Sequence, residues 1–153
     1  MASIPLNLYD TFRRGQFEGT QIDFETPGGN GIKAAFVTSV YTPNQNLHDF
    51  WSDAEANEVS GTGYVAGGNV MSNGTVTVDG AGVVTVDLDD PATWTQDASG
   101  FADARRVILY HDTGTAATSP VIGYSDAFAS DQGNVNGDIF ISIAATGLIT
   151  SAR

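Results

Sequence analysis

The sequence predicts an all-β fold, an antiparallel β-sandwich of about seven to eight strands, jelly-roll-like or immunoglobulin-like, with a short N-terminal helix. Short apolar runs alternate with period two, as half-buried strands do. The 18 glycines cluster with other turn residues between these runs. Alternating strand–helix units, which would indicate a parallel sheet, are missing. The 153 residues suit one sandwich domain, residues 1–153, in which residues 1–19 form a helical segment packed on the domain or extending from it.

The first expected element is an amphipathic helix at residues 6–17. Leu8 and Phe12 lie one helical turn apart, and Gly15 and Gly19 keep the helix from extending. A second helical turn is expected at residues 46–56, where Phe50 and Trp51 would anchor the core.

The remaining elements are predicted to be strands. In residues 32–41 both the even-numbered and the odd-numbered positions are largely apolar, which indicates a central strand covered on two faces. Residues 75–78 and 83–88 are joined by a short glycine-containing link that is typical of a β-hairpin. Further strands are expected at residues 63–65, 105–110, 121–124, 139–143 and 148–150.

Charge and composition exclude several classes of function. There are 18 Asp and Glu against 6 Lys and Arg, a net charge of -12, so the surface repels phosphate backbones and no nucleic-acid partner is expected. The pairs Arg13-Arg14 and Arg105-Arg106 are predicted to pair with nearby carboxylates. Without cysteine there is no disulfide. No apolar run is long enough to span a membrane and no secretory signal opens the chain, so we expect a soluble protein made in the bacterial cytoplasm of a host.

The residues that could support catalysis do not form a recognisable constellation. His48-Asp49 and His111-Asp112 are sequence neighbours, and neighbours on a strand point to opposite faces, so neither pair makes a dyad. A triad with Ser119 or Ser125 lacks the Gly-x-Ser-x-Gly elbow. The sequence therefore predicts neither an enzyme nor a cofactor site.

Two acidic clusters supply oxygen ligands of the kind that calcium accepts. Neither reproduces the spacing of an EF-hand loop, so solvated turn carboxylates are the preferred interpretation and no metal is predicted. The clusters are Asp87, Asp89 and Asp90, and then Asp131, Asn134, Asn136 and Asp138.

Several motifs along the chain resemble a family of small tailed-phage virion structural proteins. They are Leu8-Tyr9-Asp10-Thr11-Phe12, Ile32-Lys33-Ala34-Ala35-Phe36-Val37, Glu58-Val59-Ser60-Gly61-Thr62-Gly63-Tyr64, Asp112-Thr113-Gly114-Thr115 and Ser119-Pro120. The resemblance implies a capsid decoration or cement protein, located on the capsid surface of the virion, that binds the phage major capsid protein and stabilises the head. A homo-oligomer is compatible with that role.

Two segments are candidates for contact with the partner. The N-terminal segment offers an apolar stripe and paired guanidiniums, and the loop of residues 112–119 offers polar turn residues. The candidate contact residues are Leu8, Phe12, Arg13, Arg14, Asp112, Thr113, Thr115 and Ser119.

Two other functions stay open. A neck or tail component, such as a head–tail connector or a tube-associated protein, would be present in few copies and would bind neck or tail proteins. A carbohydrate- or receptor-binding module would need exposed aromatic rings, for which Tyr64, Trp94 and Tyr124 are the candidates.

Overall fold

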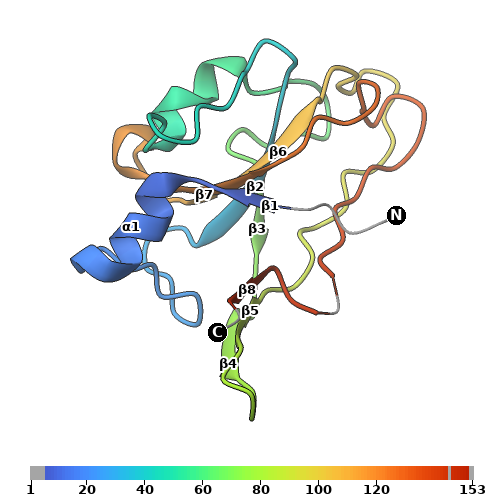
Figure 1. Cartoon of the computed structure of the whole chain (residues 1–153). Coiled ribbons are helices and arrows are strands. Elements are labelled where there is room, and N and C mark those ends of the chain that lie inside the picture. The colour runs from blue at the N-terminus through green and yellow to red at the C-terminus, as the bar shows by residue number, and fades with distance from the viewer. Residues whose placement is uncertain (1–5, 145, 152–153) are drawn as a thin grey trace.

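The fold of the chain was determined as a computed structural model, which describes residues 6–144 and 146–151. The described part of the chain forms two antiparallel sheets, one with strand order β1-β7-β6-β2-β3 and one with strand order β4-β5-β8 (Figure 1). The all-β prediction is confirmed: the two sheets make a sandwich-like fold that is not closed. The strands are β1 Leu6–Leu8, β2 Ile32–Val37, β3 Asn69–Met71, β4 Thr75–Val78, β5 Val84–Asp87, β6 Arg106–His111, β7 Val121–Ser125 and β8 Ile149–Ser151.

The larger sheet is covered on both faces at its centre. Strand β2 lies between β6 and β3, and all its positions except Lys33 are buried. Its alternate residues divide between two apolar cores, which is the pattern of a strand without a solvent face. The central strand predicted over residues 32–41 is confirmed, although it ends at Val37. Of the residues of β2, β6 and β7, the first core contains Ile32, Ala34, Phe36, Val107, Leu109 and Ile122, and the second core contains Ala35, Val37, Ile108, Tyr110 and Val121.

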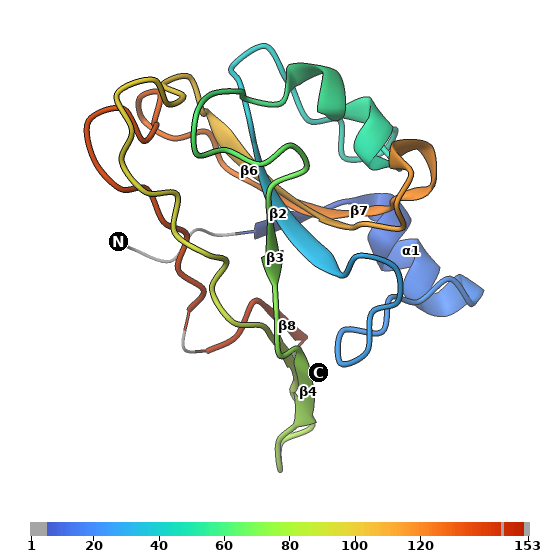
Figure 2. The same ribbon diagram turned by 180° about the vertical axis from the view of Figure 1, so that it is seen from behind.

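The first core is closed by the smaller sheet and by long irregular segments, which run along one side of the molecule in Figure 2. Trp94 lies against Phe36, with 4.6 Å between ring centroids. Trp94 also forms a single antiparallel bridge with Ile139. The strand predicted at residues 139–143 is therefore wrong: Ile139 and Ile141 point inward, but no strand of the described part of the chain pairs with this segment.

The second core contains several large aromatic residues beside its aliphatic ones. The ring of Trp51 stacks on Tyr110 with centroids 4.5 Å apart, and the hydroxyls of Tyr9 and Tyr41 are 2.7 Å apart. Trp51 is an anchor as predicted, but Phe50 is 40% exposed and is not. Instead of one helical segment at residues 46–56, two 3-10 helices form, η1 Trp51–Asp53 and η2 Glu55–Asn57.

The N-terminal segment divides into a strand and a helix. The predicted helix at residues 6–17 is wrong at its start, because β1 pairs with β7 and only α1, Asp10–Glu18, is helical. β1 approaches closely because Gly123 has no side chain; an added Cβ there would lie 2.7 Å from Cγ of Leu6. α1 continues through Gly15, contrary to the prediction, and ends at Gly19, which adopts the left-handed conformation with φ 82°.

The smaller sheet confirms the predicted hairpin. β4 pairs with β5 in a regular register from Thr75↔Asp87 to Val78↔Val84, and both views show the hairpin extending away from the rest of the molecule (Figures 1 and 2). Strands β6, β7 and β8 lie where they were predicted, with ends shifted by a residue. The strand predicted at residues 63–65 is wrong: this stretch turns at Gly63, with φ 80°.

Candidate functional site

A groove separates α1 from the turns at residues 49–50 and 118–120. Its volume is about 420 Å³, and it is lined by Phe12, Arg14 and Glu18 on α1 and by Phe50 and Pro120 on the turns, among others. Phe50 and Pro120 form an antiparallel bridge, so the two turns make one continuous wall. The structure thereby brings the N-terminal segment and the end of the loop of residues 112–119 to the same groove.

The apolar members of the N-terminal segment belong mainly to the core. Phe12 is 8% exposed, and its ring lies edge-on to Phe24 with centroids 6.0 Å apart. Leu8 is half-buried on β1 and packs against the first core. Arg13 and Arg14 are exposed, so of the four candidate contact residues in this segment only the two arginines are exposed to solvent.

Of the four arginines in the two Arg-Arg pairs, three pair with carboxylates, as the sequence predicts, whereas Nη1 of Arg106 donates to the carbonyl of Ser125 at 3.3 Å. Nη1 of Arg13 lies 3.6 Å from Oδ1 of Asp10, and Nε of Arg14 lies 3.1 Å from Oε2 of Glu18. Arg105 is likewise paired with a carboxylate in a neighbouring loop. Exposed pairs of this kind contribute about 0–1 kcal/mol, so a partner surface can replace them at little cost.

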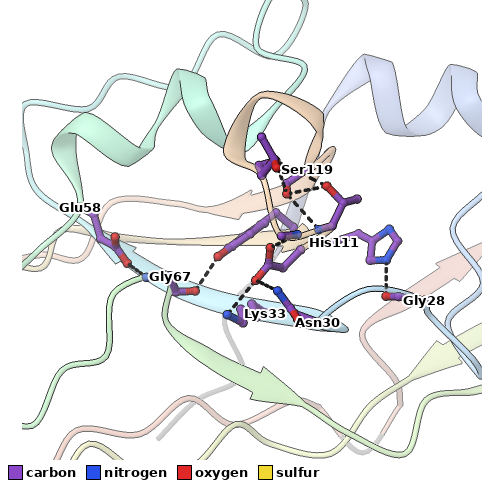
Figure 3. Close-up of polar contacts among 12 residues, drawn as sticks. Gly28, Asn30, Lys33, Glu58, Gly67, His111 and Ser119 are labelled. Carbon is purple, nitrogen blue, oxygen red and sulfur yellow. Dashed lines mark hydrogen bonds and ion pairs between the residues drawn. The ribbon is translucent and has the colours of Figure 1, made fainter.

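Asp112 holds the start of the loop of residues 112–119 through contacts with Lys33, Asn30 and Gly114, and Figure 3 labels the first two of these partners. Its Oδ2 lies 2.8 Å from Nζ of Lys33 and accepts a hydrogen bond from Nδ2 of Asn30 at 3.2 Å. Its Oδ1 accepts from the backbone N–H of Gly114 at 2.8 Å. Burial disfavours the ionised carboxylate, but these donors and the Lys33 charge outweigh it and hold the pKa of Asp112 below its ordinary value. Asp112 is therefore a fixed anchor of the loop.

Ser119 closes the other end of the same loop. It is fully buried; its Oγ accepts from the N–H of Thr113 at 3.0 Å and donates to the carbonyl of Thr115 at 2.9 Å. The hydroxyls of Thr113 and Thr118 are 2.7 Å apart. Of the four candidate contact residues in this loop, Thr113 and Thr115 are exposed, while Asp112 and Ser119 shape the loop that presents them.

Sequence reasoning missed the role of Glu58. Its Oε1 accepts from the hydroxyl of Tyr64 at 2.7 Å and from the N–H of Gly67 at 2.6 Å, while Tyr110 donates to the carbonyl of Gly67 at 2.7 Å (Figure 3). Burial raises the pKa of Glu58. The hydrogen bonds from Tyr64 and Gly67 and the charge of Lys33 offset only part of that effect. No local sequence signal marks this contact, because the chain folds back through a glycine-rich turn to make it.

Both histidines are held by groups other than carboxylates in the described part of the chain. Nδ1 of His48 lies 2.8 Å from the hydroxyl of Tyr41, and Nε2 of His111 lies 2.8 Å from the carbonyl of Gly28 (Figure 3). Of the two serines considered for a triad, Ser119 is engaged by backbone groups of its own loop, and Ser125 accepts from the N–H of Val107 and donates to the carbonyl of Asp126. The structure does not bring the candidate catalytic residues together.

The aromatic residues considered for sugar binding do not form an exposed platform. Trp94 is 1% exposed and its ring is parallel to that of Tyr64, with centroids 6.4 Å apart. Tyr124 is half-buried and lies against Tyr9, with centroids 4.9 Å apart. These rings pack against each other and against the cores, and Trp94 has no face free for a ligand.

The acidic loops are engaged by backbone donors. Oδ1 of Asn134, a buried side chain, accepts from the N–H of Phe101 at 2.9 Å. Oδ1 of Asp138 accepts from the N–H of Gln96 at 2.7 Å, and Oδ1 of Asp90 accepts from a backbone N–H as well. Within residues 6–144 and 146–151, no group of three or more His, Asp or Glu side chains is placed to hold a metal ion.

No helix in the described residues has the length and apolar character needed to cross a membrane. No family model, no curated protein and no solved structure matches this chain.

Proposed function

We propose that this chain is a bacteriophage virion structural protein, a decoration or cement protein that binds the outside of the major capsid protein lattice and stabilises the head. The observation that carries the proposal is the meeting of two distant segments at one groove. Thr118, at the end of the loop of residues 112–119, lines the groove together with α1, and Arg13, Arg14, Thr113 and Thr115 are exposed on these two segments. The resemblance to tailed-phage virion proteins supplies the class of partner.

The loop geometry supports a binding role. Asp112 and Ser119 fix the loop from both ends, so little conformational freedom is lost when a partner contacts Thr113 and Thr115. The net charge of -12 keeps the protein away from DNA phosphates, which suits a position outside a packaged genome.

The copy number in the virion tests the proposed location. Quantitative mass spectrometry of purified virions gives the ratio of this chain to the major capsid protein, and cryo-electron microscopy gives its position. Hundreds of copies on the shell support the proposal. A few copies at one vertex or along the tail assign the protein to the neck or tail, and no copies at all rule out a virion component.

The role of the groove is tested with a matched pair of arginine variants. Arg14→Glu reverses the charge at the groove, whereas Arg105→Glu reverses it at an arginine that pairs with a carboxylate elsewhere. Binding to shells that lack the protein should be lost with Arg14→Glu and kept with Arg105→Glu. Equal binding by both variants would remove the groove from the interface.

A further inference from the structure

Strand β4 has an open edge, and its own residues carry no protection against pairing. It is the outer strand of the smaller sheet, and all four of its residues are exposed. Edge strands of monomeric proteins are usually blunted by lysine, proline or a bulge. Thr75–Val78 contains no charged residue and no proline, and its register with β5 is regular.

The hydrogen-bond pattern of the hairpin shows which backbone groups face this edge. The N–H of Asp79 donates to the carbonyl of Val83 at 3.0 Å. Because bonded and non-bonded pairs alternate along an antiparallel ladder, Thr77↔Thr85 is a bonded pair, whereas Val76 and Val78 direct their backbone groups away from β5. The open edge therefore offers the N–H and C=O of Val76 and Val78.

One of these groups has a weak partner. The N–H of Val76 donates to Oε1 of Glu25 at 3.4 Å, and Glu25 is exposed. A contact of this length is at the limit of a hydrogen bond, so an incoming carbonyl can displace it.

The side chains of the same two residues form an apolar face. Val76 is 41% and Val78 66% exposed. Val76 lines a groove of about 390 Å³ together with Val84, Val86 and Ile149 of the same sheet and with Phe24 of the main body, among others. Pairing a second apolar strand with β4 would extend this face.

The carboxylates of Asp79 and Asp23, which lie near the edge, are satisfied within the chain and do not call for a basic partner. Oδ1 of Asp79 accepts from the N–H groups of Ala81 and Val83 at 2.8 and 2.9 Å. Asp23 likewise accepts three hydrogen bonds from its own turn. The strand that best fits this uncharged edge is one that is itself uncharged and alternates valine with threonine.

We propose that β4 pairs antiparallel with β4 of a second copy of this chain, which joins the two smaller sheets into one. A two-fold axis at Thr77 places Val76 opposite Val78 of the other copy, so the outward N–H and C=O groups of both residues pair in both copies. The valines then lie on one face, as directly opposed residues do. Asp79 lies opposite Thr75 of the other copy, so within the two paired strands no carboxylate opposes another. This pairing is independent of the proposed role in the virion.

Analytical ultracentrifugation of the purified chain tests the pairing. The weight-average mass should rise from 16.0 kDa toward twice that value as the protein concentration is raised to about 1 mM, the range expected for the dissociation constant of a small interface. Both copies carry a net charge of -12, so added NaCl should tighten the dimer. A monomer at every concentration and salt level would overturn the proposal and leave the edge to a strand of another protein.

Substitutions at Val78 locate the interface. Val78→Pro removes an outward N–H without removing a donor to β5, so it should abolish the dimer. Val78→Thr keeps this N–H and should still form the dimer. If Val78→Pro lowers the thermal stability of the monomer, Val78→Lys, which adds the charge found on protected edges, serves in its place. A dimer that survives both Pro and Lys lies elsewhere on the molecule.

Amide hydrogen exchange followed by NMR gives an internal control. The amides of Val76 and Val78 should exchange more slowly as the protein concentration rises. The amide of Thr77 is already directed to β5 and should not change. Slowing at Thr77 alone, or no slowing at Val78, would contradict the pairing.

Discussion

Asp112 links β2 to the loop of residues 112–119 through its contact with Lys33. Asp112→Asn removes the charge and should lower the free energy of unfolding by about 1.5–3 kcal/mol, the usual contribution of a hydrogen bond to a charged group. The lowered pKa of Asp112 means that this contribution is present above the ordinary value of 3.8 and is lost as the pH falls through the folded-state value.

Urea denaturation from neutral pH to about pH 3 measures the effect, with Asp103→Asn, an exposed loop carboxylate, as the control. The difference in the free energy of unfolding between wild type and Asp112→Asn should be largest near neutrality and should shrink below pH 3.8. A gap that does not depend on pH would mean that Asp112 acts by shape and not by charge.

Glu58 should have the opposite pH dependence. Its pKa is raised above the ordinary 4.5, so the Glu58 carboxylate binds a proton more readily in the folded protein than in the unfolded chain. The corresponding stability is present below pH 4.5 and is lost as the pH rises through the folded-state value. Gln at this position can still accept from Tyr64 and Gly67 but cannot titrate.

Glu58→Gln should therefore gain stability relative to wild type as the pH is raised from about 4 to about 8. Denaturation curves of the two proteins over this range measure the difference, with Glu55→Gln, an exposed neighbour, as the control. A constant difference between Glu58→Gln and wild type would contradict the raised pKa.

At the scale of the elements, α1 illustrates how a helix end depends on one backbone conformation. Gly19 has φ 82°, and a Cβ added there would meet no atom within 4 Å. Gly19→Ala should thus cost about 1–2 kcal/mol for the left-handed conformation alone. Gly80→Ala, at a turn with equal space and without a positive φ, should be close to neutral.

Thermal unfolding followed by circular dichroism compares these two alanine variants. Equal melting temperatures would show that the helix end adapts by a change of conformation. A lower melting temperature for Gly80→Ala than for Gly19→Ala would contradict the assigned geometry of both turns.

For the molecule as a whole, the net charge of -12 opposes compaction. Carboxylates outnumber cations three to one, at 18 against 6, and the repulsion among them acts over a distance that salt shortens from about 30 Å at 10 mM to about 3 Å at 1 M. The melting temperature should therefore rise with added NaCl. Differential scanning calorimetry at a fixed low protein concentration measures this effect, and a melting temperature that falls with salt would show that the ion pairs outweigh the repulsion.

The sequence by itself determined the all-β class, the central strand at β2, the hairpin of β4 and β5, and the local pairing of Arg13 and Arg14. These features depend on alternation, turn residues or neighbours within one helical turn, which are properties of short stretches of chain. The acidic surface is likewise a matter of composition.

Only the tertiary structure decided which segments meet. The inward alternation of Ile139 and Ile141 looks like a strand, but pairing needs a neighbour, and the described residues supply only the bridge to Trp94. Leu6–Leu8 is a strand because Gly123 admits it. The anchors at Asp112 and Glu58, the groove beside α1 and the open edge of β4 depend on contacts between residues far apart in sequence. No short-range pattern encodes such contacts, because the free energy that selects them arises only when the whole core packs.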